Sequence, residues 1–111
     1  MSWLLREGDV LAAVEDRRPG WQLGLTGAVL VSPPALLHTW KGAASLDLAW
    51  CIRVRTDDGN QCFEVRRISR LAPHRVARPR LSGAIVAAGL GAFERWHLQV
   101  GDRLEVRPAD D

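Results

Sequence analysis

The sequence predicts a mainly β fold, a small β-barrel or sandwich in one domain over residues 1–111, with one short helix before the last strand. Short apolar stretches alternate with Gly, Pro, Asp and Asn along most of the chain, a pattern typical of short strands joined by turns. Asp58-Gly59 lies between two alternating stretches, which predicts a central hairpin. Helical spacing of apolar residues is clear only near the end of the chain. These observations favour an all-β architecture.

The hairpin is predicted over residues 46–71, turning at 57–60. With Asp58-Gly59 as a two-residue loop, Thr56 pairs with Gln61 and Ile52 pairs with Val65. The core face then holds Leu48, Trp50, Ile52, Val54, Phe63 and Val65. The solvent face holds Asp47, Cys51, Arg53, Arg55, Cys62, Glu64 and Arg66. Arg66-Arg67 breaks the alternation, which predicts a bulge or a strand end there.

The remaining elements are short. Strands are predicted, in chain order, over residues 2–5, 10–14, 28–31, 36–40, 84–88 and 104–107. Two helical stretches are predicted over residues 20–25 and 92–98. In the second stretch Phe93, Trp96 and Val100 fall on one apolar face. The order of elements leaves strand neighbours beyond the hairpin open.

The cysteines and the first residues bear on the compartment. In the predicted register Cys51 and Cys62 lie ~13 Å apart on one face, too far for a disulfide. Two free thiols indicate a reducing compartment. Charged residues at positions 6, 7 and 9 stand where a signal peptide would be apolar, so we expect a cytoplasmic protein.

Composition and charge exclude several classes of protein. With 47% apolar and 25% charged residues, the chain is neither disordered nor collagen-like. The net charge is only +2, but residues 64–80 hold six arginines and one acidic residue. The candidate anion-binding residues in this strip are Arg66, Arg67, Arg70, Arg78 and Arg80. Guanidinium groups bind phosphates and carboxylates in a forked geometry, so an acidic protein or a nucleotide fits the strip.

Two other interpretations of the arginine strip differ from binding of an acidic protein or a nucleotide. The first is a solvated face that is partly paired with Glu64 and other acids. The second is nucleic-acid binding, which is disfavoured because the net charge is small and the sequence indicates no exposed aromatic side chain among the arginines.

A second candidate site is a loop rim that holds His38, Thr39, Trp40 and Asp47, with Arg75 nearby if the loop at 73–75 folds back. An Asp that accepts a hydrogen bond from a His ring is half of a general-base arrangement. In the alternative interpretation, Asp47 and Thr39 bind loop backbone groups and His38 only packs. No catalytic residue is assigned, because no motif supplies a nucleophile to complete a triad.

Metal and cofactor motifs are not found in the sequence. The three histidines are scattered, and the two cysteines are not at metal-ligand spacing. Gly83, Gly89 and Gly91 lack the lysine and the βαβ context of a phosphate loop. Trp50 and Trp96 are predicted in the core, whereas Trp40 is a candidate wall for a ligand.

The order of several short motifs points to a family. They are WQLGLTG at 21–27, His38-Thr39, Leu46-Asp47, Asp58-Gly59, Pro73 with Arg75, GAFERW at 91–96 and GDRLEV at 101–106. Over residues 20–106 this order resembles the bacterial and archaeal family called domain of unknown function 192, or uncharacterised ACR. The resemblance implies a small, mainly β bacterial-type domain with a helix before its last strand, and no particular activity.

The sequence therefore predicts a binding or interaction module rather than an enzyme, for a small ligand or an acidic protein partner, without a membrane. The first alternative is a hydrolase-like enzyme that uses His38 and Asp47 as a base pair. The second is binding of an anionic partner by the arginine strip.

Overall fold

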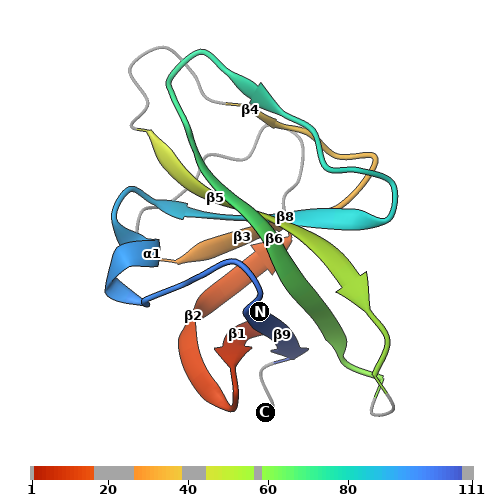
Figure 1. Ribbon diagram of the computed structural model, residues 1–111. Helices are drawn as coiled ribbons and strands as arrows, with labels where there is room; N and C mark the ends of the chain where they lie inside the picture. The colour runs from red at the N-terminus through yellow and green to blue at the C-terminus, as the bar shows by residue number, and fades with distance from the viewer. Residues whose placement is uncertain (1, 17–26, 39–44, 57–58, 109–111) are drawn as a thin grey trace.

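The computed structural model describes residues 2–16, 27–38, 45–56 and 59–108. Within these residues, seven strands form a closed barrel in the order β1-β2-β3-β8-β5-β6-β9, and two short strands form a separate ribbon, β4-β7 (Figure 1). The predicted fold class is confirmed: the described residues form a β-barrel with one short helix near the C-terminus, before the last strand. The predicted helix at 20–25 lies outside the described residues.

The barrel is closed by the first and last strands of the chain. β1 (Ser2–Arg6) pairs on one side with β2 (Asp9–Asp16) and on the other with β9 (Arg103–Pro108). Glu7 and Gly8 join β1 to β2 with φ angles of 52° and 85°, the left-handed conformation that a tight hairpin turn needs. β2 runs parallel to β3 (Ala28–Val31), and the other barrel pairs are antiparallel.

β5 (Leu46–Val54) and β6 (Gln61–Leu71) form the long central hairpin. The predicted pairing near the turn is wrong by one residue, because Ile52 faces Glu64 and Cys51 faces Val65. The strands stop at Val54 and Gln61, so the connecting loop is longer than the two residues that the prediction assumed. The predicted bulge is confirmed: the register shifts between Trp50 and Cys51, and Arg66 is the extra residue.

A shift of one residue exchanges the two faces of a strand, and this explains which side chains are inside. Phe63 and Val65 point into the barrel together with Ala49 and Cys51, not with Trp50 and Ile52 as predicted. Alanines at 28, 49, 84 and 88 share this interior cluster, which leaves room for Phe63 and Leu104. A tryptophan in place of Ala49 or Cys51 would overfill it, so Trp50 lies on the outer face.

A second apolar cluster covers part of the outer face of the barrel. Ile85 and Ala87 of β8 (Gly83–Gly89) pack there with Leu46, Leu48 and Leu71 of the hairpin. The ribbon made by β4 (Leu37–His38) and β7 (Val76–Ala77) covers this cluster with Leu37 and Ala77. β8 is therefore buried on both faces along its whole length. The strand predicted at 36–40 forms at 37–38, and its last two residues are not described. β7 was not predicted.

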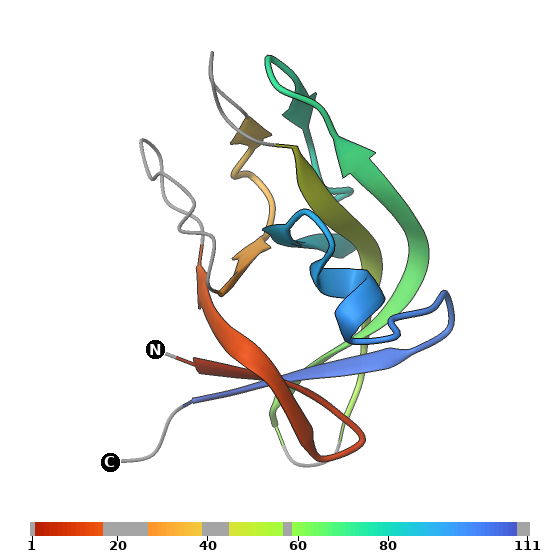
Figure 2. The ribbon, with the colours of Figure 1, turned by 90° about the vertical axis from the view of Figure 1, so that its left-hand side faces the viewer.

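The helix α1 (Ala92–Arg95) lies in front of the barrel in Figure 2 and packs Ala92 and Phe93 into the interior cluster. It is shorter than the predicted 92–98. The predicted apolar face is correct for Phe93 and Trp96, whose rings lie 5.5 Å apart, but wrong for Val100, which is 61% exposed. His97 has a φ of 54°, which redirects the chain, and Leu98 points inward instead. No helix in the described part of the chain is long and apolar enough to cross a membrane.

Candidate functional site

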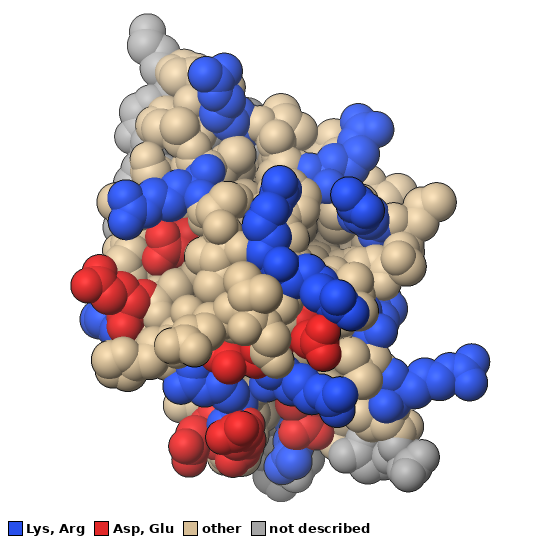
Figure 3. Space-filling view, viewed as in Figure 1, with Lys and Arg blue, Asp and Glu red and all other residues tan. Residues whose placement is uncertain are grey.

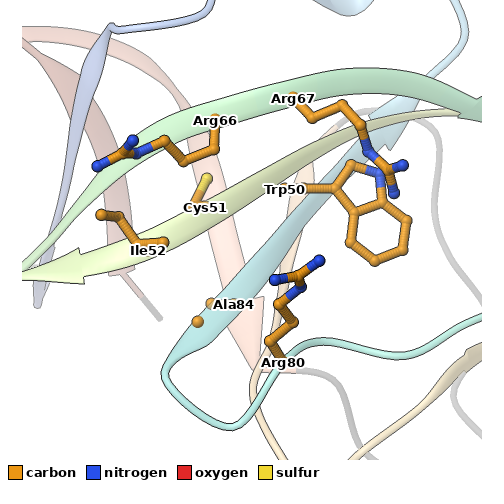
Figure 4. Close-up of a pocket in the computed structure, with 8 residues that line it drawn as sticks. Trp50, Cys51, Ile52, Arg66, Arg67, Arg80 and Ala84 are labelled. Atoms are coloured by element: carbon orange, nitrogen blue, oxygen red, sulfur yellow. The ribbon is translucent and has the colours of Figure 1, made fainter.

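A hollow near the basic side chains lies on the outer face of the barrel, where β5, β6 and β8 run side by side. It has a volume of about 570 Å³ and is lined by Trp50, Cys51, Ile52, Arg66, Arg67, Arg80, Gly83 and Ala84 (Figure 4). We call it the arginine groove. Three of the five predicted anion-binding arginines, Arg66, Arg67 and Arg80, meet here. Their charges come from the bulge in β6 and from the loop that precedes β8.

Trp50 forms one end of the arginine groove, beside Arg67 and Arg80. Its indole Nε1 donates a hydrogen bond to the Ser69 hydroxyl at 2.8 Å, which fixes the orientation of the ring. The Arg67 guanidinium carbon lies 4.4 Å from the ring centroid, within the range of a cation–π contact. Trp50 is half-buried and packs against the outer apolar cluster. The ring and the guanidinium therefore form one cation–π pair, with the ring held in place by Ser69.

The other two arginines flank this pair. Figure 4 shows Arg80 pointing toward the indole from the side of β8, and Arg66 extending along β6 away from the indole. The Nε of Arg66 lies 2.8 Å from Glu64, so one edge of this guanidinium is already paired. Within the described residues no acidic side chain forms an ion pair with Arg67 or Arg80. The arginine groove thus carries more positive than negative charge.

The surface around the groove agrees with this charge. Figure 3 shows basic side chains distributed over the upper face that the hairpin and β8 make, while the acidic ones lie at its left edge and in its lower half. Arg70 and Arg78, the other two candidates, are exposed but do not line the groove. Arg70 instead approaches Asp47 at 3.9 Å.

Cys51 contributes no reactive thiol to the groove. Its side chain belongs to the interior cluster, and burial raises the pKa of the thiol from 9.0 to about 12. At neutral pH the thiolate, the nucleophilic form, is therefore negligible. Cys51 and Cys62 are both free. Because the register differs from the predicted one, they lie on opposite faces of the hairpin, with Cys51 buried and Cys62 half-buried.

The predicted rim is only partly assembled. β7 pairs with β4 and places Val76 opposite His38, so the loop with Arg75 does fold back toward His38. Thr39 and Trp40 lie outside the described residues. Asp47 lies on the face of β5 that looks into the barrel, whereas β4 packs on the outer face. β5 therefore separates Asp47 from the ribbon that carries His38.

Asp47 has partners of its own. Its Oδ2 accepts hydrogen bonds from the backbone N–H groups of Gly91 at 3.0 Å and Phe93 at 3.2 Å. These are N–H groups at the start of α1, which find no acceptor within the helix. The Asp47 side chain is buried, with 8% of its surface exposed. In the described residues no group of three or more His, Cys, Asp or Glu side chains could hold a metal ion.

The residue that the sequence analysis missed is Trp50, which it placed in the core. The useful signal was the register of the hairpin. The predicted register, continued past the bulge toward Leu46 and Leu71, pairs Trp50 with Arg67, and the structure shows the same pair. A tryptophan that lies opposite an arginine on the neighbouring strand forms a cation–π pair at the surface more often than a contact in the core.

Comparison of the chain with family models, with curated proteins and with solved structures finds no match. The resemblance to the family of domain of unknown function 192 stays a prediction, and the site has to be interpreted from its own geometry.

Proposed function

We propose that this protein is a binding module for an anionic ligand, which it holds in the arginine groove. The observation that carries the proposal is that Arg66, Arg67 and Arg80 line one hollow, with Arg67 and Arg80 beside an ordered tryptophan. Guanidinium groups bind phosphate and carboxylate oxygens through two parallel hydrogen bonds, and these are stronger than bonds between neutral groups. Arg80 has no acidic partner among the described residues, so an anion would not have to displace one there.

The hydrolase alternative has less support. It requires Asp47 to orient His38 as a general base. The Asp47 carboxylate is occupied by two backbone N–H groups of α1 and lies across β5 from the ribbon that holds His38. A structural role accounts for these contacts without any reaction.

The test is a titration of the folded protein with tripolyphosphate and citrate, followed by calorimetry. We expect binding that weakens as the salt concentration rises, because exposed charges are screened. Arg80→Gln should weaken binding about tenfold or more, since a hydrogen bond to a charged group contributes roughly 1.5–3 kcal/mol. Arg78→Gln is the matched control, an exposed arginine in the same loop that does not line the groove, and should change affinity less than about twofold.

Two results would contradict the proposal. One is the absence of binding to either anion at low salt. The other is an equal loss of affinity in Arg78→Gln and Arg80→Gln, which would mean that general surface charge, not the groove, attracts the anion.

We also propose that the protein acts in the cytoplasm. Both cysteines are free, and structural disulfides are rare in reducing compartments. Cys62 is half-buried, so its thiol would remain open to oxidation in an extracellular setting.

A further inference from the structure

The contact between Trp50 and Arg67 offers more than charge. The Ser69 hydroxyl accepts a hydrogen bond from the indole nitrogen, and the guanidinium carbon lies 4.4 Å from the ring centroid, so a planar cation and an aromatic ring are already in contact. A guanidinium plane is a stacking surface for nucleic-acid bases, and so is an aromatic ring. A ligand with a flat, weakly polar ring could stack on this pair at little entropic cost, because the protein side is ordered beforehand.

The positive charge continues from this pair in one direction. Arg80 points toward the indole from β8, and Arg66 extends along β6 away from it, above Ile52 (Figure 4). The floor between them consists of apolar or small residues, Ile52, Gly83 and Ala84. The occupant that uses all of these features has a planar group at one end and several negative charges toward the other.

From this asymmetry we infer that the ligand of the arginine groove is a nucleotide, with its base on the Trp50–Arg67 pair and its phosphates held by Arg80 and Arg66. The inference rests on the proposed anion-binding function and specifies its ligand. The volume of about 570 Å³ lies within the range of ordinary small-molecule sites. A simple carboxylate or an inorganic phosphate would use the arginines but leave the cation–π pair without a role.

A nucleotide reaches such a groove either free or as one unit of a single-stranded nucleic acid. A second hollow lies nearer to the hairpin turn, lined by Arg53, Val54, Arg55, Cys62 and Ser82. Its two arginines place further positive charge beyond Ile52 along β5. The next phosphates of a strand would have to reach this second hollow, whereas a free nucleotide would leave it empty.

The experiment compares ATP, tripolyphosphate and a short oligodeoxythymidine by calorimetry at one low salt concentration. ATP and tripolyphosphate have similar charge, so the difference between them measures the contribution of the base and sugar. We expect ATP to bind roughly tenfold more tightly, the order of magnitude that stacking of one base contributes. Trp50→Ala should abolish that difference, and Trp50→Phe, which keeps a ring, should retain most of it. Circular dichroism of both variants verifies that they fold.

Each outcome decides a different point. Equal affinity for ATP and tripolyphosphate would overturn the nucleotide inference and leave the anion-binding proposal intact, whereas no binding of either would overturn both. If Trp50→Ala fails to fold, the ratio of the ATP affinity to the tripolyphosphate affinity decides the matter, measured in the unmodified protein and in Trp50→Phe.

An oligodeoxythymidine that binds more tightly than ATP, with the excess lost in Arg55→Gln, would identify nucleic acid as the source. Binding of polyglutamate without binding of ATP would overturn the inference in favour of an acidic protein.

Discussion

Asp47 illustrates how one buried side chain can serve an element that lies far away in the sequence. Gly91, the residue before α1, has a φ of 89° and no side chain to accept hydrogen bonds from the first turn. Asp47 reaches this turn from β5 and accepts the N–H groups of Gly91 and Phe93. The carboxylate also lies at the N-terminal end of the helix, where negative charge is favourable.

Asp47→Ala should therefore destabilise the protein by about 2 kcal/mol or more, because a cap is lost and two N–H groups are left without acceptors. Asp47→Asn should lose less, since the amide oxygen can still accept a hydrogen bond. Urea unfolding measures both. Glu94→Ala, which removes an exposed carboxylate from the same helix, is the control and should change stability by less than about 0.5 kcal/mol. If Asp47→Ala were as stable as the unmodified protein but failed to bind anions, the rim hypothesis would be favoured instead.

At the scale of elements, two local irregularities build the arginine groove. The bulge in β6 adds Arg66 between two regular stretches of pairing, so Arg66 and Arg67 are both exposed. At the start of β8, Gly83 pairs with Ile52 and lies so close to β5 that an added Cβ would stand 2.4 Å from the Cys51 carbonyl oxygen. The glycine therefore lets β5 and β8 approach each other beneath the groove.

Gly83→Ala should force these two strands apart, because the nearest neighbour of the new methyl group is the backbone oxygen of Cys51, which cannot rotate away. We expect a loss of about 1–3 kcal/mol in the free energy of unfolding, the usual cost of overpacking. Anion affinity should fall as well, since the floor of the groove moves. Leu81→Ala, two residues earlier and 93% exposed, provides the comparison and should leave both quantities nearly unchanged. Wild-type stability in Gly83→Ala would show that the strands are not in close contact.

For the molecule as a whole, closure of the barrel by β1 and β9 encloses an interior that excludes water from Cys51. The pKa of this thiol is consequently raised from 9.0 to about 12. The chain has no tyrosine, and its only lysine is Lys41. Few other groups can therefore obscure the titration of Cys51.

The alkaline behaviour follows from linkage. In the folded state Cys51 keeps its proton up to about pH 12, whereas in the unfolded chain it loses the proton near pH 9. The stabilisation is thus complete below about pH 9 and is lost as the pH rises toward 12, by at most ~1.4 kcal/mol per pH unit. Denaturant unfolding across this range should show a steeper decline for the unmodified protein than for Cys51→Ala. Cys62→Ala is the control, and equal slopes in the unmodified protein and Cys51→Ala would mean that water reaches the thiol.

Much of the fold could be predicted from local patterns. The strand at 28–31 and the outer ends of the hairpin, Leu46 and Leu71, are where the sequence analysis expected them. The alternation of apolar residues and the composition of turns depend only on residues that are close together in the sequence, so both can be recognised in a single chain. β7 was not predicted because a strand of two residues is too short to show alternation of apolar and polar side chains. It is a strand only through its pairing with β4.

The candidate site was predicted less completely. The arginine strip was found because six arginines within residues 64–80 are a matter of composition. That Arg66, Arg67 and Arg80 converge, while Arg70 turns to Asp47, depends on which strands become neighbours. Trp50 was assigned to the core because a large apolar side chain on an alternating strand usually faces inward.

The sequence by itself therefore determined a β protein with a central hairpin, a helix before the last strand, two free cysteines and a concentrated basic strip. Only the tertiary structure decided which face of the hairpin is inside, and with it the position of Trp50 among the arginines. The physical reason is that side chains alternate with a period of two, so a shift of one residue at the loop exchanges both faces. Local alternation is the same in either register, and the limited space inside a closed barrel selects between them.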